Sequence, residues 1–147
     1  MEIDETEVRR VADELAIRSL VARYADAVTQ NDGRAWIETW AEGGRWFMGG
    51  SASEGREKLL ETWQTLMALF ERVIQLPQHG LVELAGDQAT GRWGVVELGR
   101  TKDGSPSFTL GAYHDAYRRV ETSWKFSERR FEFIYTGAPD LSGQWLS

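Results

Sequence analysis

The chain has 147 residues, and its 17 Lys and Arg against 23 Asp and Glu give a formal net charge of -6. This length predicts one domain with its own hydrophobic core, and the negative charge argues against nucleic acid or an anionic membrane as the main partner. The absence of cysteine excludes disulfides, thiolate metal ligands and a thiol nucleophile. The charged N-terminus is unlike a signal peptide and no apolar run approaches the ~20 residues of a membrane span, so we expect a soluble cytoplasmic protein.

The first half of the sequence predicts helices. Apolar residues recur at helical spacing from Val8 to Val28, behind a candidate N-cap at Asp4, and the turn residues 31–33 end the pattern. A short second helix is expected from Arg34 to about Trp40, followed by a strand in the glycine-flanked run 43–50. The third helix is expected after an N-cap at Ser53, with an apolar stripe of Leu59, Trp63, Leu66 and Phe70.

After residue 72 the pattern changes to long β-branched and aromatic runs separated by turn residues, which is typical of antiparallel strands. Helices followed by a strand meander predict an α+β domain, with about three helices on one face of a bent, mainly antiparallel sheet. The tail 137–147 lacks periodicity and is expected to cover apolar surface. The four expected strands are 73–84, 88–100, 107–120 and 123–136.

Two histidines are the first candidates for chemistry. His79 lies in a predicted strand beside Pro77 and Gly80, whose backbone preferences suggest a bulge that could redirect the imidazole. The alternative for His79 is a half-exposed residue of an edge strand. We interpret His114 as structural. The seven Trp, six Phe and four Tyr fill a core or form the walls of an apolar pocket.

Three charged residues have two possible roles each. Asp32 can cap the short second helix, and the same carboxylate could also pair with another side chain. Glu97 shares a strand face with Trp93 and Val95, which predicts either a buried carboxyl group or a position just beyond the core. Arg129 is either a solvated strand residue or an inward-facing anion clamp.

Taken together, several short motifs resemble the SnoaL-like branch of the nuclear transport factor 2-like superfamily over nearly the whole chain. This resemblance implies a cone-shaped α+β barrel that encloses a cavity. The motifs are Tyr24-Ala25-Asp26, Asp32 with Trp36, "AEGGRW", His79, "ATGRW" and "GAYHDAYRR" with "SWKFSERR".

Within this superfamily the chain is most similar to the cofactor-free lyases scytalone dehydratase, bile-acid dehydratase and hexachlorocyclohexane dehydrochlorinase. Their catalytic Asp–His pair matches Asp32 and His79, and the dehydrochlorinase's pocket tryptophan and arginine match Trp46 and Arg129. The resemblance implies no cofactor and no metal, and a homotrimer, with a dimer as the alternative. Met48 stands where scytalone dehydratase has a tyrosine donor, so the group that assists the leaving group does not carry over.

These observations predict a cofactor-independent lyase that removes water or hydrogen halide from a small, largely apolar, cyclic substrate. On this resemblance Asp32 would orient His79, and the imidazole would take the proton. Either Arg129 or a neutral Glu97 would stabilise the departing anion or enolate oxygen. The alternatives are an isomerase or polyketide cyclase with the same base, or a non-catalytic domain for ligand binding or assembly. The predicted substrate-binding residues are Tyr24, Trp46, Met48, Trp93, Val95, Glu97 and Tyr113.

Overall fold

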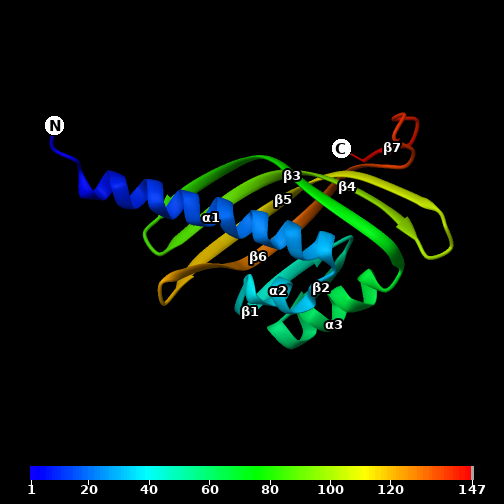
Figure 1. Cartoon of the computed structure of the whole chain (residues 1–147), viewed down its shortest axis with the longest axis horizontal. Helices are drawn as coiled ribbons and strands as arrows, with labels where there is room; N and C mark the ends of the chain where they lie inside the picture. The colour runs from blue at the N-terminus through cyan, green and yellow to red at the C-terminus, as the bar shows by residue number, and fades with distance from the viewer. Residues whose placement is uncertain (147) are drawn as a thin grey trace.

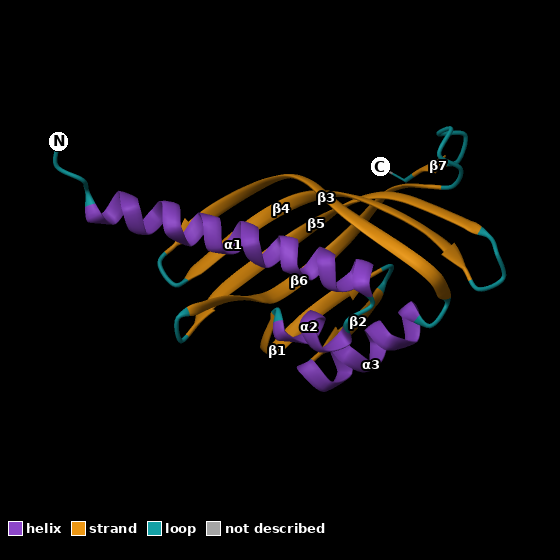
Figure 2. Ribbon diagram, viewed as in Figure 1, coloured by secondary structure: helices purple, strands orange, loops and turns teal. Residues whose placement is uncertain are grey.

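A computed structural model describes residues 1–146 and places three helices on one side of a strongly curved sheet (Figures 1 and 2). The helices are α1 (Glu5–Gln30), α2 (Gly33–Glu38) and α3 (Arg56–Met67). The strands are β1 (Trp40–Met48), β2 (Ser51–Glu54), β3 (Phe70–Ala85), β4 (Gln88–Thr101), β5 (Pro106–Val120), β6 (Ser123–Thr136) and β7 (Gln144–Trp145).

The sheet has the strand order β2-β1-β6-β5-β4-β3, and β7 pairs with β6 beside this path. All the pairings are antiparallel except that of β1 with β6. The predicted α+β architecture, with helices on the concave face of a bent and mainly antiparallel sheet, is therefore confirmed.

The long helix α1 begins and ends with the expected local signals. The Asp4 carboxylate accepts a hydrogen bond from the backbone N–H of Thr6, and Asn31 closes the helix in the left-handed conformation with φ of 53°. The buried face begins at Ile17, whereas Leu15 is exposed, and the first turns of α1 extend beyond the sheet (Figure 1). No helix in the described part of the chain is long and apolar enough to cross a membrane.

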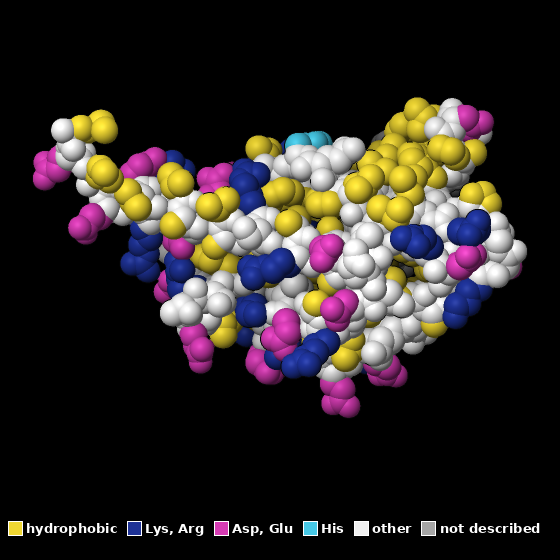
Figure 3. Space-filling view, viewed as in Figure 1, with side chains coloured by type: hydrophobic (Ala, Val, Ile, Leu, Met, Phe, Trp, Pro, Cys, Tyr) yellow, Lys and Arg dark blue, Asp and Glu magenta, His cyan; other side chains and the backbone are white. Residues whose placement is uncertain are grey.

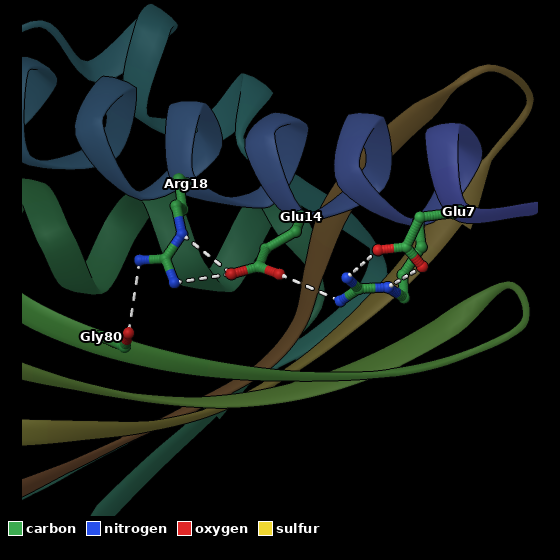
Figure 4. A network of polar contacts seen from close by, with 5 residues as sticks. Glu7, Glu14, Arg18 and Gly80 are labelled. Atoms are coloured by element: carbon green, nitrogen blue, oxygen red, sulfur yellow. Dashed lines mark hydrogen bonds and ion pairs between the residues drawn. The ribbon is translucent and has the colours of Figure 1, made fainter. Parts of the chain in front are cut away.

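One polar contact joins the middle of α1 to β3 (Figure 4). The guanidinium of Arg18 donates to the carbonyl oxygen of Gly80 at 3.3 Å and to the carboxylate of Glu14 at 2.7 Å. Gly80 follows a register shift in the pairing of β3 with β4, and the Trp93 ring occupies the space of a Cβ at Gly80. This close approach brings Trp93 under α1.

Three predicted boundaries were wrong by a few residues. The short helix α2 ends at Glu38, and Trp40 already belongs to β1. Ser53 lies in β2, and α3 is capped instead by Gly55, whose φ of 87° is readily accessible to glycine alone. Phe70 begins β3 instead of extending α3. An apolar residue fits the spacing of a helix and that of a strand equally well, and the chain has already turned at the end of α3.

The core between the helices and the concave face is built largely from aromatic rings. Trp36 of α2 stacks on Trp63 of α3, with ring centroids 5.1 Å apart and an interplanar angle of 17°. Trp36 also contacts Trp46 of β1 and Tyr24 of α1. Offset stacking and edge-to-face contacts stabilise such clusters beyond the area that they bury. The aromatic-rich composition therefore forms both the core and the wall of a cavity.

Candidate functional site

A cavity of about 220 Å³ lies between the helices and the concave face of the sheet. Most of its lining is apolar, and its polar side chains come from β3, β4 and β5. The lining residues are Tyr24, Val28, Trp46, Met48, Trp63, Leu66, Met67, Phe70, Val73, Gln75, Glu97, Ser107, Thr109 and Phe133.

The polar wall of the cavity is one row of side chains across three strands. Gln75 of β3 is in register with Glu97 of β4, and Glu97 is in register with Thr109 of β5. The Gln75 side-chain amide donates to Oε2 of Glu97 at 3.1 Å, and the Gln75 backbone N–H donates to the Thr29 hydroxyl of α1 at 3.1 Å. The register of the sheet thus places a carboxyl group and an amide side by side inside the cavity.

Burial raises the pKa of Glu97, while the hydrogen bond from Gln75 partly opposes the shift. Glu97 is the one Asp, Glu or His among the described residues that line the cavity. A carboxyl group whose pKa is raised in an apolar site is suited to take up and release a proton during a reaction.

A tryptophan of the cavity lining offers a hydrogen-bond donor to a ligand. Trp46 lines the cavity, and its buried indole N–H has no hydrogen-bond partner among the described residues. A buried donor without a partner destabilises the folded protein, so a ligand oxygen or halogen placed there would satisfy it. Within residues 1–146, no group of three or more His, Cys, Asp and Glu side chains is arranged to hold a metal ion.

Arg129 is buried against the cavity-lining Tyr24 and forms an ion pair with Asp115. It is 1% exposed, and its Nε and Nη2 donate to the two oxygens of Asp115 at 2.8 and 3.0 Å. The Tyr117 hydroxyl also donates to Asp115, at 2.8 Å, and accepts from the indole N–H of Trp93. Arg129 therefore faces inward, but Asp115 already occupies its guanidinium, and Arg129 does not line the cavity.

The guanidinium of Arg129 also holds two tyrosines. Its Cζ lies 3.6 Å from the ring centroid of Tyr113 and 4.3 Å from that of Tyr24. The two tyrosine hydroxyls lie 3.3 Å apart. Burial raises the pKa of both phenols, so they keep their protons at neutral pH. Tyr24, which lines the cavity, is thereby a candidate proton or hydrogen-bond donor to a ligand.

The predicted contact between Asp32 and His79 is not formed. The exposed Asp32 carboxylate accepts from the backbone N–H of Ala35 at 3.0 Å and caps α2. His79 is exposed on the convex face of the sheet, where its ring lies over Gly94. Among the described residues, no hydrogen bond or ion pair joins Asp32 to His79, and neither lines the cavity.

The physical reason is the alternation of β3. Val73 and Gln75 are buried on the concave side, whereas Leu76 is 45% exposed on the other. The irregular pairing between Pro77 and Gly80 then leaves His79 outside and Gly80 under Trp93.

The other predicted residues divide into two groups. Tyr24, Trp46, Met48 and Glu97 line the cavity. Trp93, Val95 and Tyr113 are buried on the same side of the sheet, but they belong to the core next to the cavity.

Sequence reasoning missed Gln75, Thr109 and Asp115. For Gln75 the available signal was its position two residues after Val73, on the same side of the strand. For Asp115 it was the shared parity with Tyr113, on a strand that runs beside the strand of Arg129.

The tail does not reach the cavity in the described residues. Gln144 and Trp145 form β7 against β6, and the Trp145 ring packs on Tyr135 at 5.0 Å between centroids. The tail was expected to cover the cavity mouth or a subunit contact. Within 137–146 it lies at β6 and not at the cavity mouth, and Leu141 and Trp145 remain about half exposed, while Ser147 lies outside the described residues.

Variants of Asp32 and His79 test this placement. We expect Asp32→Ala to lower the free energy of unfolding by about 1 kcal/mol through loss of the cap, and Asp32→Asn to cost less because asparagine also caps. Neither these variants nor His79→Ala should change the affinity of a ligand bound in the cavity, measured by calorimetry. A tenfold loss of affinity in Asp32→Asn and His79→Ala alike would show that the two residues belong to the site after all.

The curved sheet and the helices on its concave face define the cone-shaped α+β class of proteins. The family model for the SnoaL-like domain matches residues 9–130. The chain therefore belongs to the SnoaL-like family, and its fold is that of the nuclear transport factor 2-like superfamily.

Solved structures share this fold. A hexachlorocyclohexane dehydrochlorinase is similar with a TM-score of 0.85 at 20% identity, over 96% of this chain and 97% of the other. A putative scytalone dehydratase from Novosphingobium aromaticivorans gives 0.81 at 18% identity, over 87% and 88%. A Mycobacterium tuberculosis protein of unknown function gives 0.81 at 26% identity, over 98% and 83%. A comparison with curated protein sequences gives no match.

Proposed function

We propose that this protein is a cofactor-independent lyase that acts on a small, largely apolar, uncharged cyclic molecule, with Glu97 as the group that moves the proton. The observation that carries the proposal is a single carboxyl group in a largely apolar cavity, with a pKa raised by burial. The dehydrochlorinase and dehydratase among the similar structures support a lyase. Glu97 takes the role that the sequence had suggested for His79.

The cavity limits the size and charge of the substrate. An apolar cavity of about 150 Å³ can hold benzene, so 220 Å³ suits one substituted ring. No Lys or Arg is among its described lining residues, and the buried Arg129 is neutralised by Asp115. An anionic ligand would therefore be desolvated without compensation, which favours uncharged molecules.

The reaction can be written with the groups of the cavity. The Glu97 carboxylate takes a proton from a carbon next to a carbonyl or a leaving group. The electron pair of the broken C–H bond forms the new C=C bond, and the leaving group departs with its own bonding pair. A departing hydroxide takes the proton from Glu97 and leaves as water; when a halide departs, Glu97 returns its proton to solvent.

Tyr24 and Trp46 would stabilise the charge that develops on the substrate. Both line the cavity, and each carries a donor: a phenol that stays protonated and an indole N–H without a partner. Donors that are already in place in a water-poor site stabilise a departing anion or an enolate oxygen more than they would in water.

Product mass tests the proposal. The protein would be incubated with a panel of monocyclic hydroxyketones and halogenated rings, together with their carboxylated analogues. We expect at least one uncharged compound to lose water or hydrogen halide, and the carboxylated analogues to remain unchanged. A product of unchanged mass would point to an isomerase or cyclase with the same base. Turnover of the carboxylated analogues alone would contradict the role given to the apolar cavity.

A non-catalytic ligand-binding domain is the second candidate. The observation in its favour is the separation of Asp32 from His79, which removes the catalytic pair that the resemblance implied. Ligands that bind in the cavity, across the whole panel, without any change of mass would support this candidate.

A further inference from the structure

The carboxyl group of Glu97 lies in unusual surroundings. On the face shown in Figure 3, Lys, Arg, Asp and Glu side chains are spread over the outer surface of the protein. Glu97 instead lines the cavity, where the amide of Gln75 binds it directly. Gln75 is only 6% exposed, and a buried amide needs a hydrogen-bond partner. Glu97 is the partner that the Gln75 side chain has among the described residues.

The backbone of the edge strand β3 brings these two side chains together. The N–H of Gln75 donates to the Thr29 hydroxyl of α1 at 3.1 Å, so it points away from β4. Gln75 and Glu97 are therefore a non-hydrogen-bonded pair of the antiparallel ladder, the kind in which facing side chains lie closest. Glu97 and Thr109 are then a hydrogen-bonded pair, whose side chains stand farther apart. The ladder thus makes Gln75 the near neighbour of Glu97.

The two carboxylate oxygens of Glu97 differ in their contacts. Oε2 accepts the hydrogen bond from Nε2 of Gln75 at 3.1 Å, whereas Oε1 accepts none from the described residues. The terminal torsion of a glutamate is soft, so a carboxylate without a fixed donor would exchange the places of its oxygens. A donor on a buried side chain, whose backbone is anchored to α1, opposes this exchange and leaves Oε1 open to a ligand.

We propose that Gln75 is a positioning residue: its amide holds Oε2 of Glu97, so that Oε1 takes the proton from the substrate. This inference rests on the proposed function, in which Glu97 is the base. Gln75 acts through Glu97 and takes no part in the bond changes. Its N–H also stabilises the ionised carboxylate, the form that accepts a proton, and so opposes the effect of burial on the pKa of Glu97.

The other titratable groups close to Glu97 come from α1, β5 and β6. Tyr24 lines the same cavity, and the charge of Glu97 contributes to the raised pKa of Tyr113. Burial keeps both phenols protonated at neutral pH. Asp115 and Arg129 form an ion pair with each other. The cavity-lining residues of α3, β1, β3 and β6 carry no titratable side chain. A change at Gln75 therefore acts on Glu97 before any other group.

Gln75→Met tests the proposal, because methionine keeps the length of the side chain but has no N–H. Carbon NMR of the glutamate carboxyl groups follows the titration of Glu97, whose signal is absent in Glu97→Gln. We expect Glu97 to titrate about one pH unit higher in Gln75→Met, as for the loss of one hydrogen bond to a charged group.

Turnover gives a second measurement on the same variant. The midpoint of the rate against pH should move upward with the titration of Glu97. At a pH above both midpoints kcat should still fall about tenfold, because the base is ionised but no longer held in one orientation, and KM should change less than threefold. A residue that only stabilised the fold would move neither midpoint.

Gln78→Met is the matched control. Gln78 lies exposed on the same strand and lines a hollow on the convex face, so this variant should change neither the titration of Glu97 nor the rate. Circular dichroism would verify that each variant is folded. An unchanged titration of Glu97 in Gln75→Met, an equal shift in Gln78→Met, or an unchanged kcat above both midpoints would overturn the inference.

The NMR titration needs no substrate, which separates this inference from the proposed function. Absence of turnover in the unchanged protein would contradict the lyase, and the titration would still decide whether Gln75 holds the Glu97 carboxylate. Turnover that depends on Glu97 but is the same in Gln75→Met would leave the lyase standing and remove the role of Gln75.

Discussion

Replacing Glu97 with glutamine is expected to reduce turnover by roughly 10²–10⁴-fold, the usual contribution of a positioned acid or base. Glutamine keeps the shape of the side chain but cannot take a proton. Because the cavity stays apolar and of the same size, the affinity for an unreactive cyclic ketone should change little. Turnover is followed by product mass, and ligand affinity by calorimetry.

A control variant and the pH dependence of the rate can show that the loss of turnover is specific to Glu97. Glu83→Gln is the matched control, since Glu83 lies exposed on the neighbouring strand β3, and it should leave turnover unchanged. In the unchanged protein, the rate should rise with pH through the pKa of Glu97, which lies above the ordinary value of a glutamate, because only the carboxylate accepts a proton. Full activity in Glu97→Gln would exclude Glu97 as the base and leave the ligand-binding function.

The Glu97 carboxyl group also makes the free energy of unfolding depend on pH in a defined direction. Burial raises the pKa of Glu97 in the folded state, so the folded chain holds this proton more tightly than the unfolded chain does. The resulting stabilisation is complete below the unfolded pKa and is lost as the pH rises through the folded pKa. Urea unfolding across this range should show a larger loss in the unchanged protein than in Glu97→Gln, because the other titrating groups, such as Asp115, are common to both proteins.

The second large effect is expected at the buried ion pair. Asp115→Ala should lower the free energy of unfolding by about 3–5 kcal/mol, since it leaves the guanidinium of Arg129 buried without its partner. Tyr117 loses its acceptor in the same variant. The double variant Asp115→Leu with Arg129→Met should recover most of the loss, because it removes both charges and keeps apolar volume. Chemical denaturation measures all three proteins.

An exposed ion pair of the same geometry provides the control. Arg100 donates to both oxygens of Glu71 at 2.8 Å across β3 and β4, as Arg129 does to Asp115, but in solvent. Glu71→Ala should therefore change stability little. If Asp115→Ala lowered the free energy of unfolding as little as Glu71→Ala, the buried ion pair would not be needed to hold Tyr24 and Tyr113 in place.

Local sequence signals accounted for the three helices and the long strands of the fold, but not for the short strands β2 and β7. The apolar spacing from Val8 to Val28 and the cap at Asp4 predicted α1, since helix periodicity and capping depend on residues a few positions apart. Turn residues between long β-rich runs predicted β3 to β6 for the same reason. The predictions for Ser53 and Phe70 were wrong, because an alternative cap or period was available within two or three residues.

The candidate site depended on contacts that no local pattern contains. The sequence alone determined an acidic, cysteine-free chain with helices before strands, and a glutamate on the same strand face as Trp93. Only the tertiary structure decided that Gln75 lies beside Glu97, that Asp115 neutralises Arg129, and that His79 points away from Asp32. The physical reason is that side chains alternate across a strand with a period of two, so one irregular pairing in β3 moves a residue from the cavity to the opposite face.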